Sequence, residues 1–175
     1  MHRFLIILIL TAVGVGTIEY GAYTKNQAQV PSNVPKEKKA IMTTHASGTF
    51  AVKMTQHSPD DKAEGATVDR FSLNKTFQGD LEGTSKGDML AVSTPVQGSA
   101  GYVAMEQVTG TLNGRTGTFA LQHTGTMNRG APQLSVTVVP DSGTGQLVGL
   151  AGKMEIKIAD GKHFYDFVFT VAEKP

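Results

Sequence analysis

The stretch from Phe77 to Pro132 alternates between apolar and polar residues and is repeatedly interrupted by glycine. A period of two residues places successive side chains on opposite faces of a strand, so this pattern predicts antiparallel β-sheet. Polar and ionisable residues recur inside the same strand-like runs, at Glu82, Glu106, Gln122 and His123. The combination predicts a small β-barrel whose interior is partly polar.

Strand-like runs continue to the end of the chain, and no run after residue 44 has a helical period. The expected strands cover residues 48–54, 68–77, 79–92, 99–112, 115–127, 134–139, 153–158 and 163–171. Asn113-Gly114 and Asp160-Gly161 predict tight hairpin turns. Short strands at regular spacing indicate a sandwich or a barrel, and closure removes exposed strand edges. Turn-linked neighbours favour an all-β, eight-stranded antiparallel up-and-down barrel over residues 45–175.

Composition excludes several classes of function. The chain has 175 residues, enough for one domain, and its 16 basic and 15 acidic residues give a net charge of +1. No basic stripe points to nucleic acid, so we expect no nucleic-acid partner. The absence of cysteine excludes disulfides, thiolate metal sites and a lipoprotein anchor. The histidines lack zinc spacing, and no other pattern indicates a metal or a cofactor.

The N-terminal residues 1–19 have the pattern of a secretory signal peptide or an uncleaved signal anchor. Met1-His-Arg3 is basic, and residues 4–18 are uncharged and rich in Leu, Ile and Val. This run is shorter than the ~20 residues that a spanning helix prefers. Asn26-Gln-Ala28 is a weak cleavage site, so a membrane tether through residues 4–18 is the alternative. Either interpretation predicts that the domain is exported, to the periplasm or the extracellular space, and an uncleaved segment would anchor it to the inner membrane. Residues 20–44 are expected to form a flexible linker.

Three ionisable residues have the parity of inward-facing apolar positions. Lys75, Glu106 and His123 each lie two residues from an apolar residue that is expected inside. Together they would form a polar cluster at one end of the barrel, with a base and a hydrogen-bond donor for catalysis. The alternative is structural: Lys75 and Glu106 form an internal ion pair that fixes the strand register, and His123 bonds to the backbone. Glu82 has the opposite parity and is expected on the outer face.

Aromatic residues share the inward parity and supply candidate ligand contacts. Tyr102, Phe119, Tyr165 and Phe167 could line an apolar pocket together with Glu106 and His123. An aromatic strand face is also the ordinary composition of a protein core. The same residues therefore predict either a pocket or a filled interior.

Several long motifs resemble a bacterial family known as domain-of-unknown-function family 3224. They lie at residues 75–89, 101–110, 117–123, 140–145 and 150–154. The resemblance covers residues 45–171 and implies an eight-stranded barrel similar to that of plant allene oxide cyclase. It transfers no catalytic residue to this chain. Members of the family are often bare cytoplasmic domains, from which the export signal departs, and related barrels associate, which makes a homo-oligomer an expectation.

Three functions compete on these observations. The first is an exported barrel that binds a small hydrophobic molecule, with Glu106, His123 or Tyr102 orienting its polar end. The second is a cofactor-free enzyme of the cyclase or isomerase type that uses the same residues as acid and base. The third is a structural or protein-interaction barrel with a filled interior.

Overall fold

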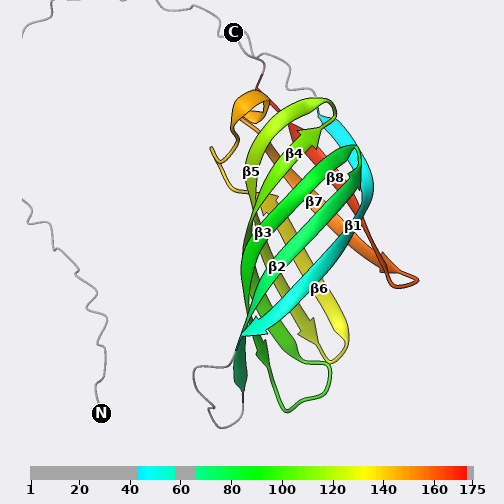
Figure 1. Ribbon diagram of the computed structural model, residues 1–175. Helices are drawn as coiled ribbons and strands as arrows, with labels where there is room; N and C mark the ends of the chain where they lie inside the picture. Colours follow the sequence, from blue (N-terminus) through cyan, green and yellow to red (C-terminus); the bar gives the residue numbers. More distant parts are fainter. Residues whose placement is uncertain (1–42, 58–65, 173–175) are drawn as a thin grey trace, which may run out of the picture. The chain divides into compact units, whose positions relative to one another are not determined.

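The computed structural model describes residues 43–57 and 66–172, which form a closed antiparallel barrel (Figure 1). Its strands follow chain order around the barrel, and each pairs with its neighbour in sequence. They are β1 (Thr44–His57), β2 (Thr67–Gly79), β3 (Leu81–Ser93), β4 (Ala100–Leu112), β5 (Arg115–Asn128), β6 (Ala131–Val138), β7 (Ala151–Ala159) and β8 (Lys162–Thr170). The predicted eight-stranded up-and-down barrel is confirmed.

The N-terminal predictions fall largely outside this description. The signal segment 1–19 and the linker 20–44, apart from its last two residues, lie outside the described residues, and Thr44 already begins β1. Within the described ranges, no helix has the length and apolarity needed to cross a membrane.

Both predicted hairpin turns are present. Asn113 and Gly114 have φ values of 45° and 78°, and Asp160 and Gly161 have 51° and 72°. Positive φ at both central positions is the geometry that suits the twist of a two-residue hairpin. The turns join β4 to β5 and β7 to β8 without a shift of register.

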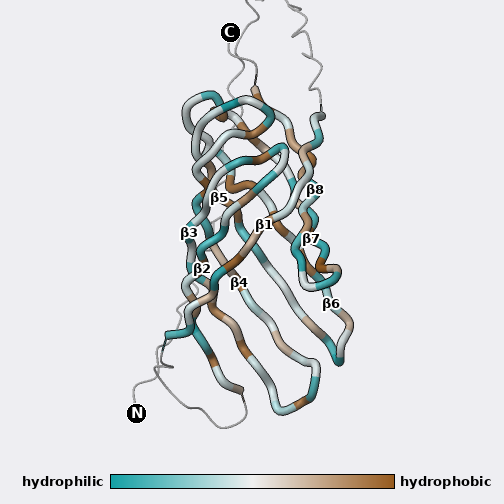
Figure 2. The backbone as a smooth tube through the Cα atoms, turned by 45° about the vertical axis from the view of Figure 1, so that its right-hand side comes forward, coloured by the Kyte–Doolittle hydropathy of each residue, from teal (hydrophilic) through white to brown (hydrophobic). Residues whose placement is uncertain are grey.

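Most strands are longer than the alternating runs of sequence from which they were predicted. β1 continues beyond residue 54 through polar residues to His57, which pairs with Arg70 of β2. Backbone hydrogen bonds between neighbouring strands do not depend on the side chains that they carry, so pairing extends past the apolar alternation. Apolar and polar residues alternate along the strands in Figure 2, as expected for a barrel with an apolar interior.

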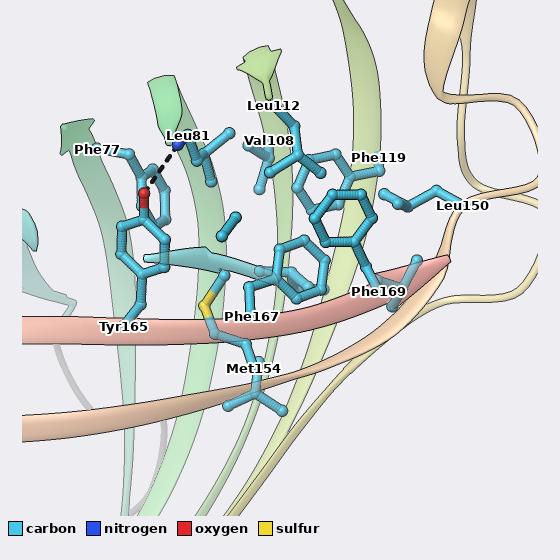
Figure 3. Close-up of a cluster of buried hydrophobic side chains, with 14 of the residues drawn as sticks. Phe77, Leu81, Val108, Leu112, Phe119, Leu150, Met154, Tyr165, Phe167 and Phe169 are labelled. Carbon is cyan, nitrogen blue, oxygen red and sulfur yellow. Dashed lines mark hydrogen bonds between the residues drawn. The ribbon is translucent and has the colours of Figure 1, made fainter. Parts of the chain in front are cut away.

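One end of the barrel is filled by side chains, and we call it the closed end. Residues 139–150, which join β6 to β7, cover it and contribute the buried Leu147 and Leu150. The backbone of this connection is held to β5 where Thr144 N–H donates to the carbonyl of Thr118 over 2.8 Å. Figure 3 shows the packed core below, in which the Phe119 and Phe167 rings stack with centroids 5.9 Å apart.

In the described part of the chain, the opposite end is not filled in this way, and we call it the open end. It comprises the inward-facing apolar residues of the other half of the strands: Met54, Phe71, Met89, Tyr102, Met127, Leu134 and Ile158. Met54 is 48% exposed and Ile158 is 65% exposed, although both share the face that is buried further along their strands. Side chains that point inward yet remain in contact with water show that residues 43–57 and 66–172 do not fill this half.

Candidate functional site

A buried polar cluster lies where the closed end gives way to the open end. Lys75 of β2, Ser85 of β3, Glu106 of β4 and His123 of β5 come from four consecutive strands, and each is at least 93% buried. Lys75 is directly opposite Ser85 in the β2–β3 ladder. Inward parity on adjacent strands therefore brings all four side chains together.

Glu106 is the centre of this cluster. Its Oε1 accepts hydrogen bonds from Lys75 Nζ over 2.8 Å and from His123 Nε2 over 2.9 Å. Its Oε2 accepts a hydrogen bond from Ser85 Oγ over 2.9 Å. An ionised carboxylate only accepts hydrogen bonds, so the proton of the His123 ring stands on Nε2. The Lys75 ammonium also lies 5.0 Å from the centroid of the Phe50 ring, a cation–π contact.

These contacts determine the charge of Glu106. Burial by itself would raise the pKa of the carboxyl, but the hydrogen bond from His123 and the charge of Lys75 outweigh it. Together they hold the pKa of Glu106 at about 2, below its ordinary value of 4.5. Glu106 is thus a carboxylate at neutral pH, with both oxygens engaged by donors.

The depressed pKa of Glu106 predicts a loss of stability in acid. Its stabilising effect is fully present above pH 4.5 and is lost as the pH falls through the folded-state pKa of about 2. A shift of this size corresponds to about 3 kcal/mol of unfolding free energy. Urea unfolding of the wild type and of Glu106→Gln at several pH values between these limits would measure it. The wild type should lose more than the variant, and equal losses would contradict the assignment.

Glycines make room for the cluster and for the tyrosine beside it. Gly87 stands opposite Glu106, and a Cβ atom on Gly87 would lie 2.6 Å from that of Glu106. The Tyr102 ring lies over Gly125 in the next strand, where a Cβ would come within 2.7 Å of three of its ring carbons. Burial and the nearby Glu106 charge raise the pKa of Tyr102, so its hydroxyl keeps its proton.

The structure separates the predicted site residues into two groups. Lys75, Glu106 and His123 come together as expected, but near the middle of their strands rather than at one end of the barrel. The packed aromatic residues fill the barrel on one side of this level. Tyr102 is half-buried and belongs to the open end.

The other aromatic candidates lie in the core of the closed end. Phe119 and Phe167 are fully buried, and Phe167 also packs against Phe169 with ring centroids 5.1 Å apart. The Tyr165 hydroxyl accepts a hydrogen bond from the backbone N–H of Leu81 over 2.8 Å (Figure 3). These contacts give all three side chains a structural role.

Sequence reasoning missed one member of the cluster and one ring beside it. Ser85 has the same parity as the buried Leu81, which was the available signal, but a serine in a glycine-rich strand gave no reason to single it out. Phe50 has the alternation of an ordinary core residue, and its proximity to the Lys75 ammonium depends on the β1–β2 register. Cross-strand neighbours of this kind cannot be read from one strand.

Acidic residues on the outer surface of the barrel do not belong to the cluster. Glu82 is exposed, as predicted. Asp80 accepts a hydrogen bond from the backbone N–H of Ser47 over 2.8 Å and so ties the β2–β3 turn to β1. Across residues 43–57 and 66–172, no three histidine, aspartate or glutamate side chains are grouped so that they could hold a metal ion.

Comparison with known proteins places this barrel in a family. A protein of unknown function from Shewanella oneidensis MR-1, in the DUF3224 family, has a similar crystal structure, with a TM-score of 0.72 and 47% identity over 75% of this chain and all of that chain. No curated protein matches. Residues 46–169 match the family described as "Protein of unknown function (DUF3224)". The match covers most of the chain and the entire polar cluster, and the chain belongs to this DUF3224 family.

Proposed function

We propose that the barrel binds a small hydrophobic molecule in its open end, with the polar end of that molecule directed to the cluster around Glu106. The observation that carries this proposal is the contrast between the two ends. The closed end is packed with aromatic and aliphatic side chains, whereas inward-facing apolar residues of the open end remain in contact with water. Apolar surface that is concave and exposed gains free energy when an apolar ligand covers it.

The polar cluster supports the orientation of such a ligand. Glu106 already accepts three hydrogen bonds, and the cluster also contains donors that a ligand could use. A lysine ammonium carries three N–H groups, and Lys75 uses one of them on Glu106. The half-buried Tyr102, whose hydroxyl keeps its proton, is a further donor on the same strand as Glu106. A ligand oxygen that accepts hydrogen bonds matches this arrangement.

The same contacts count against a cyclase or isomerase mechanism with Glu106 as the base. A general base works best when its pKa lies near the operating pH, and a carboxylate with a pKa of about 2 is a weak base. Both of its oxygens also accept hydrogen bonds, from Lys75, His123 and Ser85, which stabilise the ionised form. Binding without turnover is therefore the function that this geometry favours over the enzymatic alternative.

Native mass spectrometry of the protein purified from its own host under mild conditions tests this function. We expect a bound small molecule in the wild type and in Val103→Ala, which removes an exposed outward-facing side chain of β4. The adjacent inward-facing change, Tyr102→Ala, should weaken binding by about tenfold or more, because it removes a ring and a donor from the open end. Ligand-free protein in repeated preparations would contradict a tight-binding role. We also propose that the protein is exported, and its mass in the same spectra distinguishes a cleaved signal peptide from an uncleaved anchor.

A further inference from the structure

The wall of the barrel is incomplete between β6 and β7. Their ladder holds only the pairs Val136↔Met154 and Thr137↔Lys153. Beyond these pairs both strands continue toward the open end, where β6 is paired with β5 as far as Ala131 and β7 with β8 as far as Ala159. The facing edges, residues 131–135 of β6 and 155–159 of β7, therefore have no partner in the sheet. We call this gap the seam, and the two hairpin tips beside it lie apart in Figures 1 and 2.

The seam begins at the level of the polar cluster. Val136, which forms the last ladder pair on this side, is also the residue of β6 that pairs with His123 of β5. In the circular order of eight strands, the β6–β7 boundary lies opposite the β2–β3 boundary, which carries Lys75 and Ser85. A molecule that passed between β6 and β7 would thus arrive in the open end facing these two side chains.

The inner borders of the seam are apolar and unprotected. Leu134 of β6 is 41% exposed, and Ile158 of β7 is 65% exposed. The outward-facing residues of β7 beside them, Glu155 and Lys157, are charged. The barrel wall therefore presents polar groups to water and an apolar lining to anything that enters through the gap.

At the rim of the open end, hydrogen bonds join the connections on the β5 side of the seam. The β3–β4 and β5–β6 connections are joined where Gly130 N–H donates to the carbonyl of Gly98 over 2.9 Å, and Arg129 N–H to Ser99 Oγ over 3.2 Å. No equivalent hydrogen bond joins the tips of the β5–β6 and β7–β8 hairpins among the described residues. Within the described ranges, the seam lacks the hydrogen bonds that restrain this part of the rim.

The two edges are in register to pair. If the ladder continued beyond Val136↔Met154, Ser135 would stand opposite Glu155, and Leu134 opposite Ile156. Pro132, which lacks an N–H group, is the one residue of the β6 edge that could not donate. Closure of the seam would satisfy backbone groups that otherwise bond to water, and it would bring Leu134 and Ile156 together over the open end.

We propose that the seam is a lateral passage through which the hydrophobic ligand enters and leaves the open end, and that β6 and β7 pair to close it. This inference rests on the proposed function, since it requires a ligand in the open end. It assigns the β6–β7 edges, and not the rim of the barrel, as the route.

An engineered disulfide across the seam tests the passage. The chain contains no cysteine, so Leu134→Cys/Ile156→Cys has one possible bridge, and its formation requires Cα atoms within disulfide range. The probe is N-phenyl-1-naphthylamine, an uncharged fluorescent molecule. Its rates of association and release are measured by stopped-flow fluorescence. Oxidation should slow both rates by about tenfold or more, and a reductant should restore them. The matched control is Thr137→Cys/Lys153→Cys, which bridges β6 and β7 where they are already paired and should leave the rates unchanged.

The possible outcomes are distinguishable. Equal rates in the oxidised and reduced seam variant would overturn the passage while leaving the binding function intact. Failure of the wild type to bind the probe would overturn the proposed function and the passage with it. If the bridge does not form, the closing of the seam is refuted. The passage is then decided by labelling Leu134→Cys with a bulky maleimide, which should slow association, against the outward-facing control Gln133→Cys, which should not.

Discussion

Replacing Glu106 with glutamine is expected to lower the free energy of unfolding by about 3–5 kcal/mol. The change leaves the Lys75 ammonium buried without a counter-charge, 7% exposed and beside the Phe50 ring. An unpaired charge in such surroundings is far more costly than a lost neutral hydrogen bond. Chemical denaturation at neutral pH, with the slope of the transition checked against that of the wild type, measures this loss.

A second variant separates the charge effect from the loss of shape. Lys75→Met/Glu106→Gln removes both charges and retains an amide oxygen as acceptor for His123 or Ser85. It should recover at least half of the stability lost in Glu106→Gln, because replacing a buried ion pair by neutral groups of similar volume is often near neutral. If the double variant is as unstable as the single one, the unpaired charge is not the cause.

The second large effect is expected at the closed end. Phe167→Ala should destabilise the protein by about 3–5 kcal/mol, since it removes a fully buried ring and leaves a cavity in a packed core. The ring stacks on Phe119 and touches Phe169, so their contacts are lost as well. Thermal and chemical unfolding of the variant measure the change.

The matched control for Phe167 is on the same strand. Phe164 faces outward from β8 and is 39% exposed. Phe164→Ala should cost no more than about 1 kcal/mol, because little apolar surface is removed from the interior and no cavity forms. Comparable losses in the two variants would contradict the assignment of Phe167 to the packed core.

The cluster around Glu106 is poorly explained by stability alone. A buried ion pair is often no more stabilising than well-packed apolar residues of the same size. This barrel nevertheless places Lys75, Ser85, Glu106 and His123 at the boundary between its filled and unfilled halves. That position is where a ligand in the open end would need polar contacts. The double variant described above should therefore fold but bind the host ligand or the naphthylamine probe less tightly.

Local pattern was sufficient to predict the barrel and the inward direction of its key residues. Strand alternation has a period of two, and each strand contains several repeats of it, so the parity of Lys75, Glu106 and His123 could be read without knowing their neighbours. Asn113-Gly114 likewise determines a turn by its own backbone preferences. These features depend on residues close together in the chain.

The tertiary structure decided what the inward-facing residues do. The sharing of one Glu106 oxygen by Lys75 and His123, and the bond from Ser85, depend on the register of four strands. The filling of one end by residues 139–150 and the early end of the β6–β7 ladder depend on the path of a connection and on strand curvature. Such features arise from contacts between distant parts of the chain, which alternation within a single strand cannot specify. The sequence by itself therefore determined the barrel and the direction of its side chains, and the three-dimensional pairing determined which half is packed, which half is open and where its wall is incomplete.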